Sequence, residues 1–210
     1  SLFIIGKFKA PKLSPFISSP VFDLKSLNNN KIIPILESGR STYPDFMNKA
    51  INRATGDLLV QWNDDAFMAD GGWQALKNRA TKWKEAAGFR FPYANVRKFP
   101  PDHAKFMRPS WMSFGCYRRS TLEFCGTYHP EIHFYHCDTE LCKRVQILKG
   151  MRSLPYLDAC KVYHLNNTSG RTRTKQDRQG KRDASKCKSV CQQTRNRREI
   201  PSGVSVLPSA

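Results

Sequence analysis

The sequence predicts an α/β fold, in which helices pack on a sheet, followed by a basic C-terminal tail. Short apolar runs alternate with amphipathic segments of helical period along residues 1–165, an order typical of α/β proteins. After residue 165 the composition becomes strongly basic. We therefore expect one domain over residues 1–165 and a basic, flexible segment over residues 166–210.

Continuous apolar runs mark the strands. Leu58, Leu59 and Val60 form a short run that suits a strand buried on both faces. The chain begins with another such run, from Leu2 to Ile5. Strands are predicted in chain order at 1–8, 31–36, 58–60, 88–93, 111–117 and within 153–164.

Helical spacing of apolar residues and capping signals predict four helices. The first follows Asp45, the expected N-cap, and stops at Gly56. Ser120 and Glu123 form a capping box for a short helix that stops at Gly126. Helices are predicted in chain order at 45–55, 73–86, 120–125 and 138–149.

An acidic triplet, Asn63-Asp64-Asp65, follows the apolar strand at 58–60. In open α/β sheets, ligands bind at the carboxyl ends of the strands. Two carboxylates there provide hard oxygen ligands for Mg²⁺ or Mn²⁺, which in turn can hold a diphosphate. Such a triplet also forms simple turns, because Asn and Asp bond to nearby backbone amides, so the triplet alone leaves both interpretations open.

A second group of polar residues follows between Gly126 and His164. It consists of an aromatic loop, an acidic element, a helix with an arginine, a glycine stop and a final histidine. The residues are Asp138, Thr139, Glu140, Arg144, Gly150 and His164.

In order and spacing, these two blocks resemble the inverting family 2 glycosyltransferases of the GT-A fold, over roughly residues 30–165. In that family a helix with an Asn leads to Gly-Asp or Gly-Glu, then a strand and a DxD motif; here these are Asn48, Gly56-Asp57 and the triplet. The resemblance implies a GT-A (Rossmann-like) mixed sheet flanked by helices. It also implies metal-assisted transfer of a sugar from a nucleotide-diphosphate sugar, in first place a UDP-sugar, to an acceptor hydroxyl on a glycan or another molecule, with inversion.

The resemblance assigns roles residue by residue. Asp138 is the expected catalytic base, and Asp65 and His164 are the expected ligands of Mn²⁺ or Mg²⁺. The expected nucleotide-sugar contacts are Asn48, Asn63, Asp64 and Arg40, and the acceptor-side candidates are Trp111, Glu140 and Arg144. Where the family often has Glu-Asp, this chain has Cys137-Asp138.

The chemistry explains these residue types. In an inverting transfer the acceptor hydroxyl loses its proton as it attacks the anomeric carbon, so a carboxylate within hydrogen-bond reach serves as general base. A helix N-terminus is expected to lower the pKa of Asp138 and keep it ionised. A divalent cation neutralises the growing charge on the nucleoside diphosphate that leaves. The simpler alternatives are that Asp138 only caps a helix and that His164 is structural.

One departure from the family concerns the beginning of the chain. The family starts with a strand and loop that bind the nucleotide base, ahead of the strand that residues 1–8 match. The sequence shows no such element, so we expect a domain that lacks the first nucleotide-binding strand.

The formal charge of +18 is concentrated near the C-terminus. Between Leu165 and Glu199 the sequence has eleven basic and three acidic residues, and no aromatic residue on which a base could stack. Such a run is either a solvated tail or an attractor of nucleic acid, anionic lipid or an acidic polymer. The alternative function is therefore a non-catalytic, basic nucleic-acid or anionic-surface binding protein on a degenerate GT-A scaffold.

Composition also bears on location. No apolar stretch approaches the roughly 20 residues that span a bilayer, and the first residues do not form a signal peptide. The seven cysteines are scattered without a CxxC pair, which favours reduced thiols over a zinc site or disulfides. We expect a cytoplasmic protein.

Overall fold

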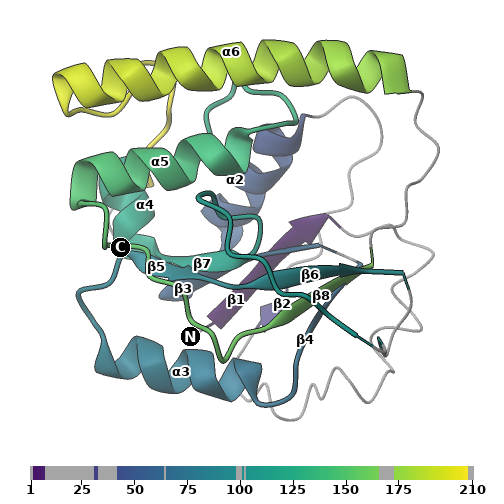
Figure 1. The fold of residues 1–210 in the computed structure, drawn as a ribbon. Helices are drawn as coiled ribbons and strands as arrows, with labels where there is room; N and C mark the ends of the chain where they lie inside the picture. The colour runs from purple at the N-terminus through teal and green to yellow at the C-terminus, as the bar shows by residue number, and fades with distance from the viewer. Residues whose placement is uncertain are drawn as a thin grey trace.

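The computed structural model describes residues 2–7, 31–32, 42–63, 65–97, 101, 103–165 and 173–207. Helices α2, α4 and α5 cover one face of the sheet, α6 lies over α5, and α3 covers the other face (Figure 1). The elements are β1 Leu2–Lys7, β2 Lys31–Ile32, α2 Tyr43–Arg53, β3 Leu58–Asn63, β4 Ala66–Met68, α3 Gly72–Lys82, β5 Gly88–Arg90, β6 Tyr93–Val96, β7 Gly115–Arg118, α4 Arg119–Cys125, α5 Cys137–Lys149, β8 Val162–Leu165 and α6 Arg173–Arg197.

The main sheet has the strand order β2-β1-β3-β7-β5. Strand β1 pairs in parallel with β2 on one side and with β3 on the other, whereas β7 runs antiparallel to β3 and β5. The strand order therefore reverses at β1, and the carboxyl ends of β1 and β3 meet at this point, with Lys7 opposite Asn63. In open α/β sheets a ligand binds in the crevice at such a switch point.

The expectation that the domain lacks the first nucleotide-binding strand stays a prediction. Strand β1 lies between β2 and β3, beside the switch point, and the sequence did not reveal this position. The order of strands in a sheet depends on pairing between distant segments, which the apolar run at residues 2–5 does not encode.

A smaller sheet joins three short strands in the order β4-β8-β6. Strand β8 runs antiparallel to β4 and parallel to β6, which places His164 opposite both Ala66 and Asn95. The backbone N–H of Leu165 also donates to the carbonyl of Asp65 at 2.8 Å. The sheet therefore brings the end of β8 beside the end of β3. Strands β4 and β6 are too short to show a periodic pattern in the sequence.

Strand β3 is buried on both faces, as its apolar run predicts. Leu58, Val60 and Trp62 belong to the core on the α3 side of the sheet. Leu59 belongs to the core that the sheet shares with α2 and α5. Successive side chains point to opposite faces of a strand, so a single element contributes to both cores.

Residues 173–197, which lie in the segment predicted to be flexible, form helix α6. Cys187, Val190, Cys191 and Thr194 are buried and recur at helical spacing, so they form one face of α6. Cys187 and Cys191 join the core that contains α5, and α6 lies along α5 (Figure 1). The sequence did not reveal this face because it consists of small and weakly apolar residues among many charges. None of the helices in the described part of the chain is long and apolar enough to cross a membrane.

The segment after α6 also packs against the domain. Leu207 is buried in the core beside α5, and the backbone N–H of Thr127 donates to the carbonyl of Ser205 at 2.8 Å. The predicted boundary near residue 165 therefore does not separate a packed domain from a free tail in the described residues.

The packing of α6 predicts the effect of a buried charge. Replacing Val190, which is buried, with Asp places an unpaired carboxylate between α6 and α5. We expect this variant to lose at least about 2 kcal/mol of unfolding free energy in urea titrations followed by circular dichroism. The control is Ser189→Asp, an exposed position of the same helix, which should change stability by about 0.5 kcal/mol or less. Equal stability of the two variants would contradict the packed helix.

Candidate active site

A cavity of about 390 Å³ opens at the carboxyl end of β3, where the topology places a ligand site. Its lining contains three residues that the sequence analysis selected, namely Asn63, Asp138 and His164. They come from the end of β3, the start of α5 and β8. The fold therefore brings together residues that lie up to about a hundred positions apart in the chain. Aromatic side chains form much of the remaining wall: Tyr43, Tyr93, Phe114, Phe134 and Tyr135.

His164 lines this cavity and pairs with Asp65, which is not itself among the lining residues. The Nε2 atom of His164 lies 3.2 Å from Oδ1 of Asp65, and Nδ1 lies 2.9 Å from Oδ1 of Asn95. If Nδ1 carries the proton and donates to Asn95, the Nε2 lone pair is free to bind a cation, as in metal sites where a second partner orients the histidine. Two ligands at right angles, each about 2.1 Å from a Mg²⁺ ion, lie about 3 Å apart, so the spacing of the pair fits neighbouring positions of one ion.

The protein would supply only part of the coordination shell. Among the described residues no group of three His, Cys, Asp or Glu side chains is placed to hold a metal. Mg²⁺ is commonly bound by one or two carboxylates, with phosphate oxygens and water completing the octahedron. The Asp65–His164 pair therefore suits a cation that arrives with a diphosphate. Asp64 and Arg40, both predicted to contact the donor, lie outside the described residues.

Asp138 lies across the cavity, at the beginning of α5. Its Oδ1 accepts hydrogen bonds from the backbone N–H and the hydroxyl of Thr139, at 2.7 and 3.3 Å. The N-cap is His136, in the left-handed region with φ 62°, so Asp138 does not cap the helix as predicted. A non-glycine residue held in that region is strained, a feature that recurs at functional sites.

The pKa of Asp138 is raised above its ordinary value of 3.8, because burial disfavours the charged carboxylate more than the hydrogen bonds from Thr139 favour it. Burial outweighs the backbone N–H groups at the start of α5, which lower this pKa as expected, so the pKa is raised overall rather than lowered. The aromatic lining removes water from the carboxylate, and this effect was not visible in the sequence. A carboxylate with a raised pKa is a stronger base than an exposed one.

Asn48 holds a loop in place and does not line the cavity. Its Nδ2 donates to the carbonyl of Tyr128 and its Oδ1 accepts from the N–H of Tyr128, both at 2.8 Å. Both halves of the amide are therefore used by one backbone position 80 residues away. In this structure Asn48 holds a loop, which is the alternative role that the sequence left open, and its binding of the nucleotide sugar stays a prediction.

Glu140 and Arg144 are fully buried and face away from solvent. Arg144 binds both carboxylate oxygens of Glu140 at 2.8 Å and donates to the carbonyls of Cys125 and Thr127. The prediction that these two residues meet the acceptor is therefore wrong. Their spacing of four residues predicts a pair on one face of a helix, but not that this face points into the core.

Trp111 is partly exposed and does not line the cavity, although its neighbours in the chain do. Its indole N–H donates to the hydroxyl of Ser113 at 3.0 Å. Phe114 lines the wall instead, with its ring centroid 5.3 Å from that of His164. The cavity therefore contains Phe114 and not Trp111.

Asp183 of α6 contributes to the site, and the sequence analysis counted it only as a minor charge. Its buried carboxylate accepts from the backbone N–H groups of His133, Phe134 and Tyr135 at 3.2, 3.0 and 2.8 Å, and from Gln179 at 2.7 Å. This loop leads directly into His136 and Asp138. A lone acidic residue in a basic run was the only sequence signal for it.

No protein-family model and no curated protein matches this chain. Solved glycosyltransferases match its structure. TarS from S. aureus gives a TM-score of 0.53 at 10% identity, over 78% of this chain and 36% of that chain. A mannosyltransferase from Pyrobaculum calidifontis, in complex with GDP-Man and Mn²⁺, gives a TM-score of 0.52 at 12% identity. The match covers 80% of this chain and 58% of the mannosyltransferase. Glucosyl-3-phosphoglycerate synthase from Mycobacterium tuberculosis, in complex with phosphoglyceric acid, gives a TM-score of 0.56 at 9% identity. The match covers 96% of this chain and 81% of the synthase.

These comparisons establish the fold. The chain has the fold of GT-A-type glycosyltransferases, which confirms the predicted fold class. The chain spans about a third of TarS and somewhat more than half of the mannosyltransferase.

The contacts of Asp183 predict how the site loop responds to their loss. In Asp183→Asn the amide oxygen replaces a charged acceptor that serves three backbone N–H groups. We expect the amides of Phe134 and Tyr135 to exchange with deuterium at least about tenfold faster, since hydrogen bonds to charged groups contribute about 1.5–3 kcal/mol. Glu199→Gln, the same change at an exposed position, is the control and should leave these amides unchanged. Unchanged exchange in Asp183→Asn would contradict the role of α6 in holding the loop.

Proposed function

We propose that this protein is an inverting, metal-assisted glycosyltransferase that moves a sugar from a nucleotide-diphosphate sugar to an acceptor hydroxyl. One observation carries the proposal: His164, which pairs with Asp65, and the partly buried Asp138 line a single cavity, and this cavity opens at the switch point of the sheet. The fold neighbours support the same general activity.

Asp65 and His164 would bind the Mn²⁺ or Mg²⁺ that accompanies the donor. When bound, this cation neutralises the charge that develops on the leaving diphosphate. The mannosyltransferase neighbour was solved with GDP-Man and Mn²⁺, and a UDP-sugar and a GDP-sugar are the first donors to test. The side chain of Asn63 reaches the same cavity and is placed to bond to the sugar nucleotide.

Asp138 would act as the general base. Its Oδ1 is occupied by Thr139, which leaves Oδ2 to accept the hydrogen bond of the acceptor hydroxyl. As the acceptor oxygen attacks the anomeric carbon, its proton passes to this carboxylate, and the bond from the anomeric carbon to the diphosphate oxygen breaks. The attack comes from the side opposite the leaving group, which inverts the configuration.

The aromatic wall has two roles in this mechanism. Phe114 and Tyr93 present apolar ring surface, which packs well against the C–H face of a sugar. The same rings exclude water, and this strengthens the interactions of Asp138 with the acceptor and limits hydrolysis of the donor.

Donor binding gives the first test. We expect calorimetric titration with UDP, GDP and their sugars to show binding that requires Mn²⁺, and Asp65→Ala to weaken it by at least about tenfold because the cation loses a carboxylate ligand. Asp70→Ala is the matched control, since Asp70 is an exposed carboxylate just beyond β4. Metal-independent binding, or an equal loss in both variants, would refute the metal site.

The base gives a second test. The rate of sugar transfer should rise with pH through the pKa of Asp138, because only the ionised carboxylate accepts the proton. Since burial raises this pKa, the rise should be centred above the ordinary value of 3.8. Asp138→Asn should lower the transfer rate at least about a hundredfold and abolish this pH dependence, while donor binding in the calorimeter stays unchanged. A variant that keeps the wild-type rate would exclude Asp138 as the base.

A further inference from the structure

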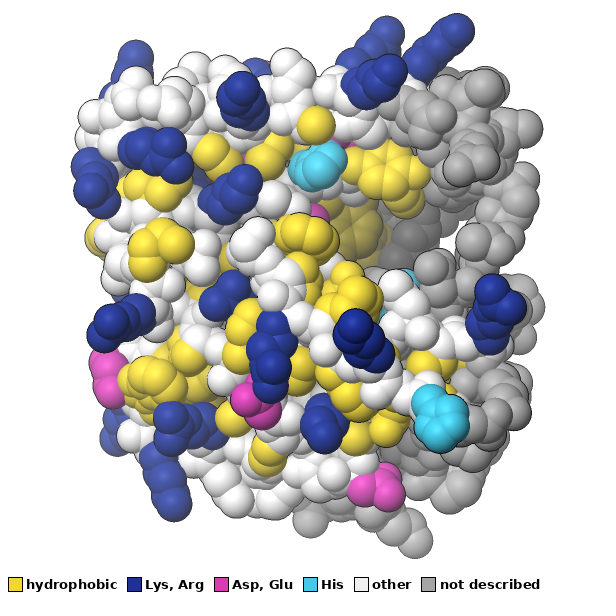
Figure 2. Space-filling view, viewed as in Figure 1, with side chains coloured by type: hydrophobic (Ala, Val, Ile, Leu, Met, Phe, Trp, Pro, Cys, Tyr) yellow, Lys and Arg dark blue, Asp and Glu magenta, His cyan; other side chains and the backbone are white. Residues whose placement is uncertain are grey.

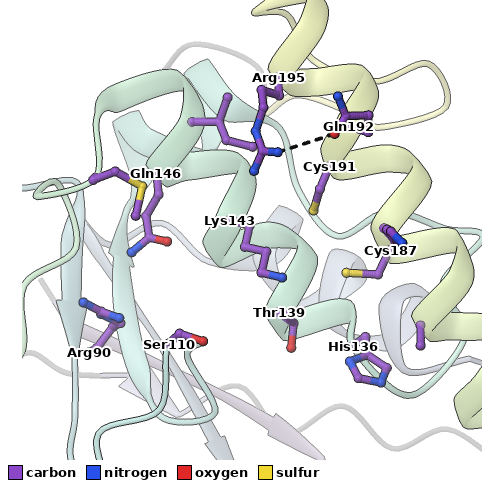
Figure 3. Close-up of a pocket in the computed structure, with 14 residues that line it drawn as sticks. Arg90, Ser110, His136, Thr139, Lys143, Gln146, Cys187, Cys191, Gln192 and Arg195 are labelled. Atoms are coloured by element: carbon purple, nitrogen blue, oxygen red, sulfur yellow. Dashed lines mark hydrogen bonds between the residues drawn. The ribbon is translucent and has the colours of Figure 1, made fainter.

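A second and larger hollow, of about 720 Å³, lies between α5 and α6 and reaches β5 (Figure 3). We call it the α5–α6 groove and define it by its cationic lining: Arg90 from β5, Lys143 from α5, and Lys188 and Arg195 from α6. No Asp or Glu lines it among the described residues. Lys and Arg side chains are spread over the whole of this face, whereas acidic side chains are visible mainly in the lower half of the view (Figure 2).

These four cations lack anionic partners in the described part of the chain. The guanidinium of Arg90 donates to the carbonyl of Leu154 at 2.7 Å and lies over the ring of Tyr156. Arg195 bonds only weakly to the neutral Gln192, at 3.4 Å (Figure 3). Lys143 and Lys188 are exposed and make no ion pair with a described residue. Charges of one sign around a hollow create a strong local potential and favour an anion.

The groove adjoins the active site. His136 lines both hollows, and Thr139, which lines the groove, donates two hydrogen bonds to the carboxylate of Asp138. A molecule whose charged end lies in the groove can therefore extend past His136 toward Asp138. The groove therefore lies beside the proposed base, and neither Asp65 nor His164 lines it.

We propose that the α5–α6 groove binds the phosphate group of a phosphorylated acceptor and directs the acceptor hydroxyl toward Asp138. A phosphate monoester carries nearly two negative charges and three acceptor oxygens, which suits a hollow that cationic groups from three elements line. A hollow of this size suits one such group better than it suits a polymer. Among the described residues no Phe, Tyr or Trp lines the groove as a stacking platform for nucleic acid. This inference rests on the proposed function, because it names the acceptor class of that site.

The test uses the complete chain and glycerol 3-phosphate as probe, without nucleotide or metal. We expect glycerol 3-phosphate to bind in a calorimetric titration, and glycerol not to bind. Glycerate, which carries a carboxylate in place of the phosphate, should bind at least about tenfold more weakly, since its single charge makes fewer charge-assisted hydrogen bonds. Glycerate that binds as tightly as glycerol 3-phosphate would overturn the phosphate assignment.

A pair of charge-matched variants locates the site. Lys143→Gln with Lys188→Gln removes two positive charges from the groove, and should weaken the binding of glycerol 3-phosphate at least about tenfold. Arg178→Gln with Lys181→Gln removes two exposed charges of α6 that do not line the groove, and should change binding by less than about threefold, since distant surface charges are screened by salt. An equal loss in both variants, or binding retained in the first, would overturn the proposal.

The outcome is separable from that of the proposed function. Loss of phosphate binding while the metal-dependent titration of the donor succeeds would refute the groove alone. Failure of the donor titration with phosphate binding intact would refute the transferase and leave an anion site in the groove.

Discussion

The position of α5 depends on one buried charge, the guanidinium of Arg144. Burial alone lowers its pKa, but the charge and hydrogen bonds of Glu140 outweigh this effect and raise the pKa, so that Arg144 stays protonated in the core. Its remaining donors bind the carbonyls of Cys125 and Thr127, at the end of α4 and just beyond it. A buried pair of this kind has a small net effect on stability, but removing one partner leaves an uncompensated charge and costs about 3–5 kcal/mol. The pair therefore specifies where α5 lies more than it adds to stability.

Other parts of the molecule converge on the same region. The backbone of Thr127 also bonds to Ser205 of the C-terminal segment, and the backbone of Tyr128 bonds to Asn48 of α2. Helices α2, α4 and α5 and the C-terminal segment thus share one hydrogen-bonded network behind the cavity. Because Asp138 begins the helix that contains Arg144, this network also fixes the carboxylate that we propose as the base, while Asp183 holds the preceding loop from the opposite side.

The sequence predicted the parts of this structure that local patterns encode. An apolar strand ending in polar residues identified Asn63 and Asp65, and the resemblance to family 2 glycosyltransferases selected Asp138 and His164. The sequence did not show that Asn48, Glu140 and Arg144 point inward, because helical spacing gives the residues on one face but not what that face meets. Nor did it show the place of β1 in the sheet, the short strands β4 and β6, or the packing of α6, because each depends on contacts with residues far away in the chain.

The distribution of charge separates two tasks that would otherwise conflict. An arginine or lysine beside Asp138 would help to bind an anionic acceptor, but it would also lower the pKa of the carboxylate and weaken it as a base. Among the described residues that line the cavity none is Arg or Lys, whereas the cations lie in the neighbouring groove, beyond Thr139 and His136. Burial can then raise the pKa of Asp138 while the cations remain close enough to hold the far end of an acceptor. Under the proposed mechanism, binding of the anion and removal of the proton are assigned to adjacent hollows, and the first turn of α5 connects them.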